Sequence, residues 1–135
     1  MDFNSLFYLS SILYASHCIG DYVFQSEFIL KYKSKDDFVL GIHCTLYTTA
    51  VILGYAIAEF MEYIKIDNYS YLILLIYISH YIIDKTIILY KDKLKEQFGT
   101  EQLNEKDSIA HNMNIKGYYS DQTLHIIFLM IGCCL

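Results

Sequence analysis

The longest uncharged stretch of the chain, residues 38–58, places the strongest constraint on its fold. It contains 21 residues, and none of them is Asp, Glu or Lys. Because an α-helix rises about 1.5 Å per residue, a helix of this stretch is about 31 Å long. The hydrocarbon layer of a lipid bilayer is about 30 Å thick. We therefore expect residues 38–58 to form a transmembrane helix.

Three other stretches predict further membrane helices. Residues 3–20 carry no charged side chain, and neither do residues 68–83 or 122–135. The last two stretches reach membrane length only when Asp84 with residues to about 90, and Asp121 with residues from about 117, are included. The sequence thus predicts an all-α integral membrane protein. The whole chain, residues 1–135, is expected to form a single domain, an antiparallel bundle of four transmembrane helices.

The lysines predict how this bundle is oriented. Nine of the ten lie in or beside the connections that follow the first and third helices, and only Lys65 follows the second helix. Short loops rich in Lys lie on the cytoplasmic side of a membrane. We therefore expect a multi-pass protein of the cell (inner) membrane with both termini outside. The polar segment 91–116 would then be cytoplasmic, with Gly99 as a break and room for a short surface helix.

Histidine and aspartate recur at a fixed spacing inside the predicted helices. Three predicted membrane segments each carry a His and an Asp four residues apart, so each pair points from one helix face. The pairs are His17 with Asp21, His80 with Asp84, and His125 with Asp121. A fourth pair, Asp107 with His111, lies in the polar segment, and its role stays open. His43, in the second helix, has Tyr47 one turn further on.

These ionisable groups are expected at similar depths, all within about 20 Å of the cytoplasmic ends of their helices. Ionisable groups inside a membrane are costly unless they are paired or bind a metal. Imidazole and carboxylate together suit a divalent transition metal such as Zn, Mn or Fe. The alternative is that they are interhelical hydrogen bonds that hold the bundle together. The candidate metal ligands are His17, Asp21, His43, His80, Asp84, Asp121 and His125.

Seven candidates exceed the four to six ligands of one ion, so either two metals bind or some residues only orient the ligands. A metal-bound water can lose its proton near neutral pH, and one catalytic carboxylate, Asp21, Asp84 or Asp121, would act as general base. Spacing does not decide among the three. Lys33 is a candidate for holding a lipid phosphate. Gln25 and Gln122 are candidates for orienting ligands or substrate.

The function that this constellation favours is a metal-dependent hydrolase of a lipid or lipid-linked substrate at the cytoplasmic leaflet. One alternative is a carrier or channel for protons or metal ions, because intramembrane His and Asp also form relays. Another is a noncatalytic membrane module that binds a partner. The sequence leaves a homo-oligomer open. The net charge is −5, and we expect no nucleic-acid partner.

The same residues resemble a family of small bacterial and phage membrane proteins of unknown function. The matching motifs are HxxxDxxxQ from His17, HxxxY from His43, HxxxD from His80 and DQxxH from Asp121. The resemblance implies a four-helix membrane protein and supplies no reaction. The ligand types are also similar to those of ceramidase-like membrane hydrolases, which bind zinc with His and Asp from several helices. That similarity is an analogy of ligands and not of fold.

Overall fold

The computed structural model describes residues 3–104 and 109–133, apart from the side chains of residues 102, 103, 110 and 111. Every regular element in these ranges is helical, so the all-α prediction is confirmed. The elements in chain order are α1 (Phe3–Cys18), the π-helix η1 (Ile19–Val23), α2 (Glu27–Tyr32), α3 (Asp37–Phe60), α4 (Tyr69–Asn104) and α5 (Ile109–Gly132).

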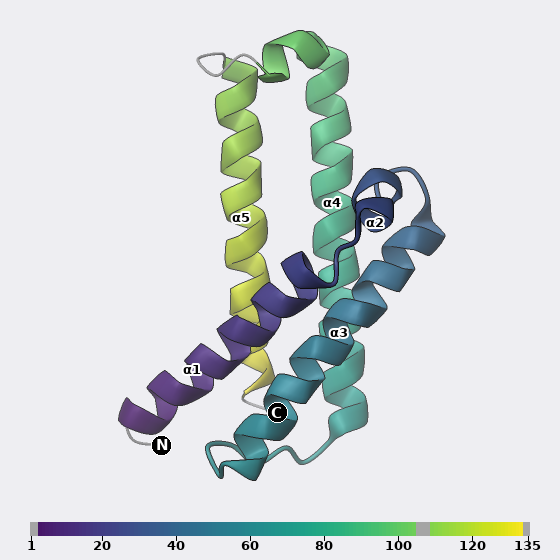
Figure 1. Cartoon of the computed structure of the whole chain (residues 1–135). Helices are drawn as coiled ribbons and strands as arrows, with labels where there is room; N and C mark the ends of the chain where they lie inside the picture. Colours follow the sequence, from purple (N-terminus) through teal and green to yellow (C-terminus); the bar gives the residue numbers. More distant parts are fainter. Residues whose placement is uncertain (1–2, 105–108, 134–135) are drawn as a thin grey trace.

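The four long helices α1, α3, α4 and α5 run in alternating directions along the chain (Figure 1). Both ends of the described chain and the α3–α4 connection lie at one end of the molecule, and we call this the terminal end. The last residues of α4 and the first residues of α5 lie at the opposite end, and α2 lies on that side of α3. Helices α4 and α5 pack side by side and extend well beyond α1 and α3. That these helices form an antiparallel bundle of four transmembrane helices stays a prediction.

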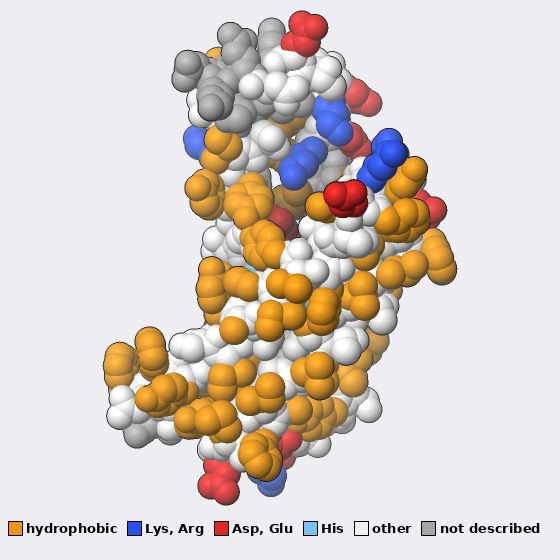
Figure 2. All heavy atoms as spheres, in the orientation of Figure 1, with side chains coloured by type: hydrophobic (Ala, Val, Ile, Leu, Met, Phe, Trp, Pro, Cys, Tyr) orange, Lys and Arg blue, Asp and Glu red, His pale blue; other side chains and the backbone are white. Residues whose placement is uncertain are grey.

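Two helices, α3 and the part of α4 from Tyr69 to Glu101, are long and apolar enough to cross a membrane. Helix α3 extends the predicted helix 38–58 by one residue at its start and two at its end. Figure 2 shows hydrophobic side chains over much of the visible face, with charged side chains gathered at its two ends. This distribution is typical of a protein surrounded by lipid. That α1 and α5 also cross the membrane stays a prediction.

The polar segment 91–116 mostly continues the two long helices. Gly99 has φ 75° and ψ 160°, a conformation that glycine adopts without steric cost, and it breaks α4 as predicted. The residues before Gly99 remain helical, so α4 is longer than the predicted helix that ended near residue 90. The predicted pair of Asp107 and His111 lies outside the described residues, because Asp107 and the His111 side chain are not described.

The apolar core occupies the terminal half of the bundle. Its fully buried members come from all four long helices and include Leu9, Leu13, Val51, Tyr55, Leu72, Ile76 and Leu129. The Tyr55 hydroxyl donates a hydrogen bond to the Leu129 carbonyl, which joins α3 to α5 inside this core. The buried polar residues His17, His43, His80 and His125 lie on the same helices, toward the other end. The bundle is thus divided into an apolar half and a polar half.

The close approach of α1 and α3 depends on Gly54. A Cβ atom at position 54 would lie 2.1 Å from Ser16 Oγ and 2.8 Å from Ser16 Cβ. Small residues allow this kind of close packing between membrane helices. We expect Gly54→Ala to destabilise the detergent-solubilised protein by about 1–3 kcal/mol through overpacking. Adding Ser16→Gly should restore most of the loss in thermal unfolding.

The matched control is Gly41→Ala. It makes the same change in the same helix, but the nearest atom to the added Cβ, Tyr77 Oη, is 3.4 Å away, an ordinary contact. Gly41→Ala should leave the melting temperature unchanged or raise it slightly, since alanine favours the helix. Equal melting temperatures for the two alanine variants would show that α1 and α3 do not pack this closely.

Candidate metal centre

The π-helix η1 places Asp21 over α3. Its wider turn is closed by a hydrogen bond from the Phe24 amide to the Ile19 carbonyl, 3.0 Å long. Gly20 makes this approach possible, because a Cβ there would lie 3.0 Å from the Tyr47 Cα atom. The α-helical spacing that we assumed for His17 and Asp21 therefore does not hold. Short π-helical turns inside α-helices are frequent at functional sites.

One capping residue and one ion pair set the level of the other ligands. Asp36 caps α3 by accepting a hydrogen bond from the Phe38 amide, 2.8 Å long. Asp37, in the first turn of α3, forms an ion pair with Lys85 of α4. His43 lies six residues beyond Asp37, and His80 lies five residues before Lys85. Because α3 and α4 run in opposite directions, this ion pair brings the two histidines to the same level (Figure 1).

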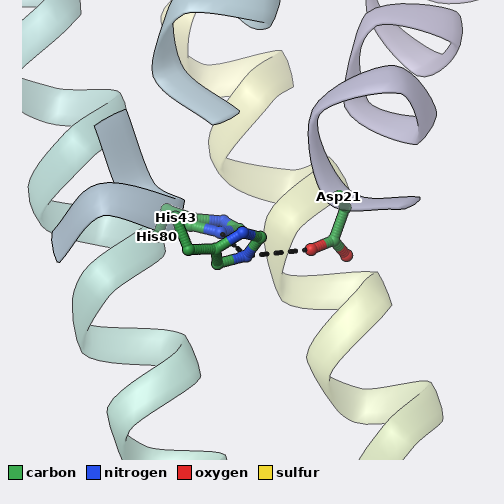
Figure 3. Close-up of side chains that lie close together, drawn as sticks. All are labelled: Asp21, His43 and His80. Atoms are coloured by element: carbon green, nitrogen blue, oxygen red, sulfur yellow. Dashed lines mark hydrogen bonds and ion pairs between the residues drawn. The ribbon is translucent and has the colours of Figure 1, made fainter. Parts of the chain in front are cut away.

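Four ligand atoms converge around His43. Its Nε2 atom lies 3.2 Å from His80 Nε2, 3.4 Å from Asp21 Oδ1 and 3.4 Å from Asp84 Oδ2. Figure 3 shows the Asp21 carboxylate directed at the His43 ring, with the His80 ring beside it. Ligands bound at about 2.0–2.1 Å around a tetrahedral ion lie roughly 3.3 Å from one another. The three separations from His43 Nε2 are therefore those expected between neighbouring ligands of one metal ion, and Asp21, His43 and His80 form one such group.

A second group shares Asp84. Its Oδ1 atom lies 3.4 Å from His125 Nε2, and Asp121 Oδ1 lies 3.1 Å from the same nitrogen. His125 also contacts His80, with their Nδ1 atoms 3.2 Å apart. Apart from these ion pairs, His125 Nε2 and Asp121 Oδ1 have no hydrogen-bond partner among the described residues. The two oxygens of Asp84 thus face two sets of ligands.

His17 lies beside these groups and is already satisfied. Its Nδ1 atom is 3.1 Å from the Tyr47 hydroxyl, and its Nε2 atom is 3.0 Å from Gln122 Oε1. A neutral imidazole that donates to Gln122 and accepts from Tyr47 uses both ring nitrogens. The structure therefore places His17 as a residue that orients its neighbours, and neither metal-ligand group of the described residues includes it.

Tyr47 belongs to the candidate site, although it is not among the site residues predicted from the sequence. Its ring stacks on His80, with centroids 3.6 Å apart and planes at 9°, and its hydroxyl binds His17. It is fully buried. Its position four residues after His43, within the HxxxY motif, is the signal that could have identified it. Tyr47 fixes the orientation of the His80 ring, which contacts His43 and His125.

The two predicted glutamines also orient other residues. Gln122 donates a hydrogen bond to Asp21 Oδ2, 3.2 Å away, and accepts one from the Tyr22 hydroxyl, 3.0 Å away. Gln25, with its amide turned so that both groups are satisfied, donates to the Asp21 carbonyl and accepts from Lys33. Both contacts hold η1 and its carboxylate in place.

Lys33, predicted to bind substrate, points into the candidate site from the end of α2. Its Nζ atom lies 3.2 Å from Asp84 Oδ2, the oxygen that faces His43. Ser26 caps the start of α2, because its side chain accepts a hydrogen bond from the Ile29 amide. A cation in the group around His43 would compete with Lys33 for the same oxygen, because both are positive.

A polar pocket of about 300 Å³ connects the candidate site to the surface. Lys33, Asp84 and Asp121 line its inner part. The remaining lining residues are Leu30, Ser34, Ile87, Ile88, Lys91, Asp92 and Lys95. Figure 2 shows Lys side chains around a hollow in the upper part of the visible face, away from the terminal end. Two of the three predicted carboxylates thus have a route to solvent.

Residues 9–134 match the model of a family described as "Protein of unknown function (DUF3307)". Because this match covers nearly the whole chain, the chain belongs to that family, and the resemblance to a family of unknown function is confirmed. The bacterial or phage origin stays a prediction. Comparison with curated proteins and with solved structures finds no match.

Proposed function

We propose that this member of the DUF3307 family is a membrane-embedded, metal-dependent hydrolase of a lipid or lipid-linked substrate at the cytoplasmic leaflet. The observation that carries the proposal is the convergence of Asp21, His43, His80 and Asp84. The ligand atoms of Asp21, His43 and His80 lie within 4.8 Å of one another, and Asp84 Oδ2 lies 3.4 Å from His43 Nε2, separations that suit a divalent transition metal, Zn, Mn or Fe. The direct test is a comparison of the lipid composition of cells that express the wild-type chain with that of cells that express the Asp121→Asn variant.

The two groups around Asp84 support two neighbouring metal positions. The Asp84 Oδ2 atom faces His43 and His80, and its Oδ1 atom faces His125. His43, His80 and Asp84 would hold one ion, and Asp84 and His125 would hold the other. Bound metal supplies a water of lowered pKa and polarises the bond to be cleaved.

Asp121 is the general base in this proposal. It lines the pocket, and its side chain retains 14% exposure, twice that of Asp84. Its Oδ1 atom lies 3.1 Å from His125 Nε2, and its Oδ2 atom accepts a hydrogen bond from Gln122. The Asp21 side chain is only 9% exposed and is also held by Gln122, and Asp84 is held by Lys33. Asp121 is therefore the most accessible of the three carboxylates for accepting a proton from water in the pocket.

The membrane arrangement in the proposal has four crossing helices. Helices α3 and α4 have the length and composition to span. Large apolar side chains are also exposed on α1 and α5, among them Phe7, Tyr14, Ile127 and Ile131. Lipid would cover these side chains. The site then lies toward the lysine-rich cytoplasmic side, and both termini lie outside.

Labelling of single cysteines tests this topology. Probes at positions 34, 67 and 104 are introduced one at a time into a chain whose natural cysteines are replaced by Ser. A membrane-impermeant thiol reagent added to intact cells should label position 67, because it lies in the outer α3–α4 connection. Positions 34 and 104 should be labelled only after the membrane is opened. The reverse pattern would place the polar pocket at the outer leaflet.

The packing of the terminal half favours an enzyme over a carrier. A path for ions must reach both faces of the membrane. Between the histidines and the terminal end, the interior is filled by apolar residues of at most 3% exposure, such as Leu13, Val51 and Leu129. The polar pocket opens at the lysine-rich end. This geometry suits a substrate that enters and leaves from one side.

A further inference from the structure

Two lysines of the pocket lie apart from the proposed metal ligands and general base. Lys91 and Lys95 lie one turn apart on α4 and line the same pocket as Asp84 and Asp121. Lys33 faces them from the end of α2. We propose that these three lysines bind a phosphomonoester group, so that the substrate is a phosphorylated lipid. This inference rests on the proposed function, because the pocket leads to the proposed metal ligands.

The charges of the pocket support a dianionic ligand. Its lining contains three lysines and three aspartates, which cancel. Two ion pairs, Lys33 with Asp84 and Lys95 with Asp92, account for four of the six charges. A single divalent cation on Asp84 would give the pocket a net charge of about +2 and release Lys33. A phosphomonoester carries about −1.5 to −2 at neutral pH.

The position of the lysines suits contact with the headgroup of a lipid and not with its acyl chain. Lys91 and Lys95 are seven and eleven residues beyond Asp84, so their backbones lie about 10 and 16 Å further along α4. Here α4 extends past the ends of α1 and α3 (Figure 1). The flexible lysine side chains reach back into the pocket, where they can contact a phosphate whose other side faces the metal ligands.

Apolar residues on the pocket wall favour a lipid over a soluble phosphate. Leu30 of α2 and Ile87 and Ile88 of α4 line the same pocket as the lysines and aspartates. An amphiphile presents an apolar surface to these side chains and a phosphate to the lysines. The same two α4 lysines also line an adjoining polar pocket of about 200 Å³ with Thr100, Asn104 and Asn114. That pocket offers hydrogen-bonding groups beside the phosphate.

The implied reaction is hydrolysis of the phosphate ester. A bond forms between the oxygen of water and phosphorus, and the bond between phosphorus and the lipid oxygen breaks. The proton of the attacking water passes to Asp121. The lipid leaves as an alcohol after its oxygen takes up the proton that Asp121 received, and inorganic phosphate is the second product. Water is the co-reactant, and no electron transfer is needed.

Binding of a non-hydrolysable analogue tests the inference without turnover. The full chain is reconstituted in phosphatidylcholine nanodiscs with Mn²⁺. It is then titrated with a dioctanoyl phosphonate analogue of phosphatidic acid, with dioctanoylglycerol and with inorganic phosphate. We expect the phosphonate lipid to bind most tightly. The double change Lys91→Gln with Lys95→Gln should weaken its binding roughly 10- to 100-fold through lost charge-assisted hydrogen bonds.

Two control variants isolate the lysines. Lys91→Arg with Lys95→Arg keeps both charges and should retain most of the affinity. Lys65→Gln removes one charge at the terminal end, where the Lys65 side chain is 87% exposed, and should change nothing. Circular dichroism and gel filtration check that each variant is folded.

The outcomes separate the inference from the proposed function. If the double glutamine variant binds the phosphonate lipid as tightly as the wild type, the phosphate subsite is wrong and the hydrolase proposal stands. If inorganic phosphate binds as tightly as the phosphonate lipid, the lipid part of the inference is wrong. If binding depends on the lysines but no phosphate is released from phosphatidic acid or any other phosphorylated lipid, the subsite stands and the proposed function fails.

Discussion

Replacing His80 by alanine should remove most of the bound metal from the purified protein. Wild-type protein is expected to contain about one or two transition-metal ions per chain, since Asp84 faces two groups of ligands. His80 belongs to both candidate groups, with Asp21 and His43 in one and with Asp84 and His125 in the other. Loss of a residue that only supports a metal ligand typically lowers metal affinity by roughly 10- to 100-fold. Loss of a ligand itself should lower the affinity by at least as much. Metal content after gel filtration in detergent, measured by elemental mass spectrometry, checks this.

His17→Ala is the matched control. It removes an equally buried histidine from the same polar half of the bundle, but one whose contacts are with Tyr47 and Gln122. We expect this variant to retain clearly more metal than His80→Ala. Wild-type protein that is folded and active without metal would show that the histidines and aspartates only hold the helices together by hydrogen bonds.

The sequence predicts the convergence of these residues because few structures are compatible with long apolar runs. Backbone groups in lipid must be satisfied internally, so an uncharged run such as 38–58 has a helix as its main solution. Short connections then make successive helices antiparallel. Under these two constraints, His43 and His80 have to lie at similar depths. The prediction for the group around Asp84 needs no information beyond spacing and helix direction.

The π-helix at Ile19–Val23 could not be predicted in the same way. Its formation depends on the packing of Gly20 against Tyr47, a contact between residues far apart in the sequence. The spacing of His17 and Asp21 indicates an α-helical pair. In the structure, however, Asp21 contacts His43 and His17 contacts Tyr47. Tyr47 is not among the predicted site residues, because a tyrosine in a membrane helix is ordinarily a packing or interfacial residue.

The length of α4 is a third feature that local composition obscures. The charged residues from Lys91 onward end the apolar run, and this favoured a helix end near residue 90. An existing helix, however, propagates into polar sequence at little cost, since each added residue adds a hydrogen bond. Helix α4 therefore continues to its break at Gly99. This extension is what brings Lys91 and Lys95 to the pocket.

Asp121→Asn should abolish turnover while leaving the fold and most of the metal in place. The substitution keeps the size of the side chain but removes the charge that accepts a proton. Loss of a positioned general base typically lowers the rate by on the order of 10² to 10⁴. The measurement is mass spectrometry of total lipids from cells that express the wild type or the variant at equal levels. A lipid species that the wild type depletes should persist with the variant.

Comparison with the other two aspartates distinguishes a base from a ligand. Asp21→Asn and Asp84→Asn should also lower turnover, but with loss of metal, because both carboxylates face His43 in the group proposed to hold the first ion. Asp121 belongs to neither three-residue ligand group among the described residues. If Asp121→Asn loses as much metal as Asp84→Asn, then Asp121 is a ligand and the base must be sought elsewhere. If no lipid or lipid-linked species differs between cells with the wild type and cells with any of the three variants, transport or partner binding replaces hydrolysis as the better account of this polar centre.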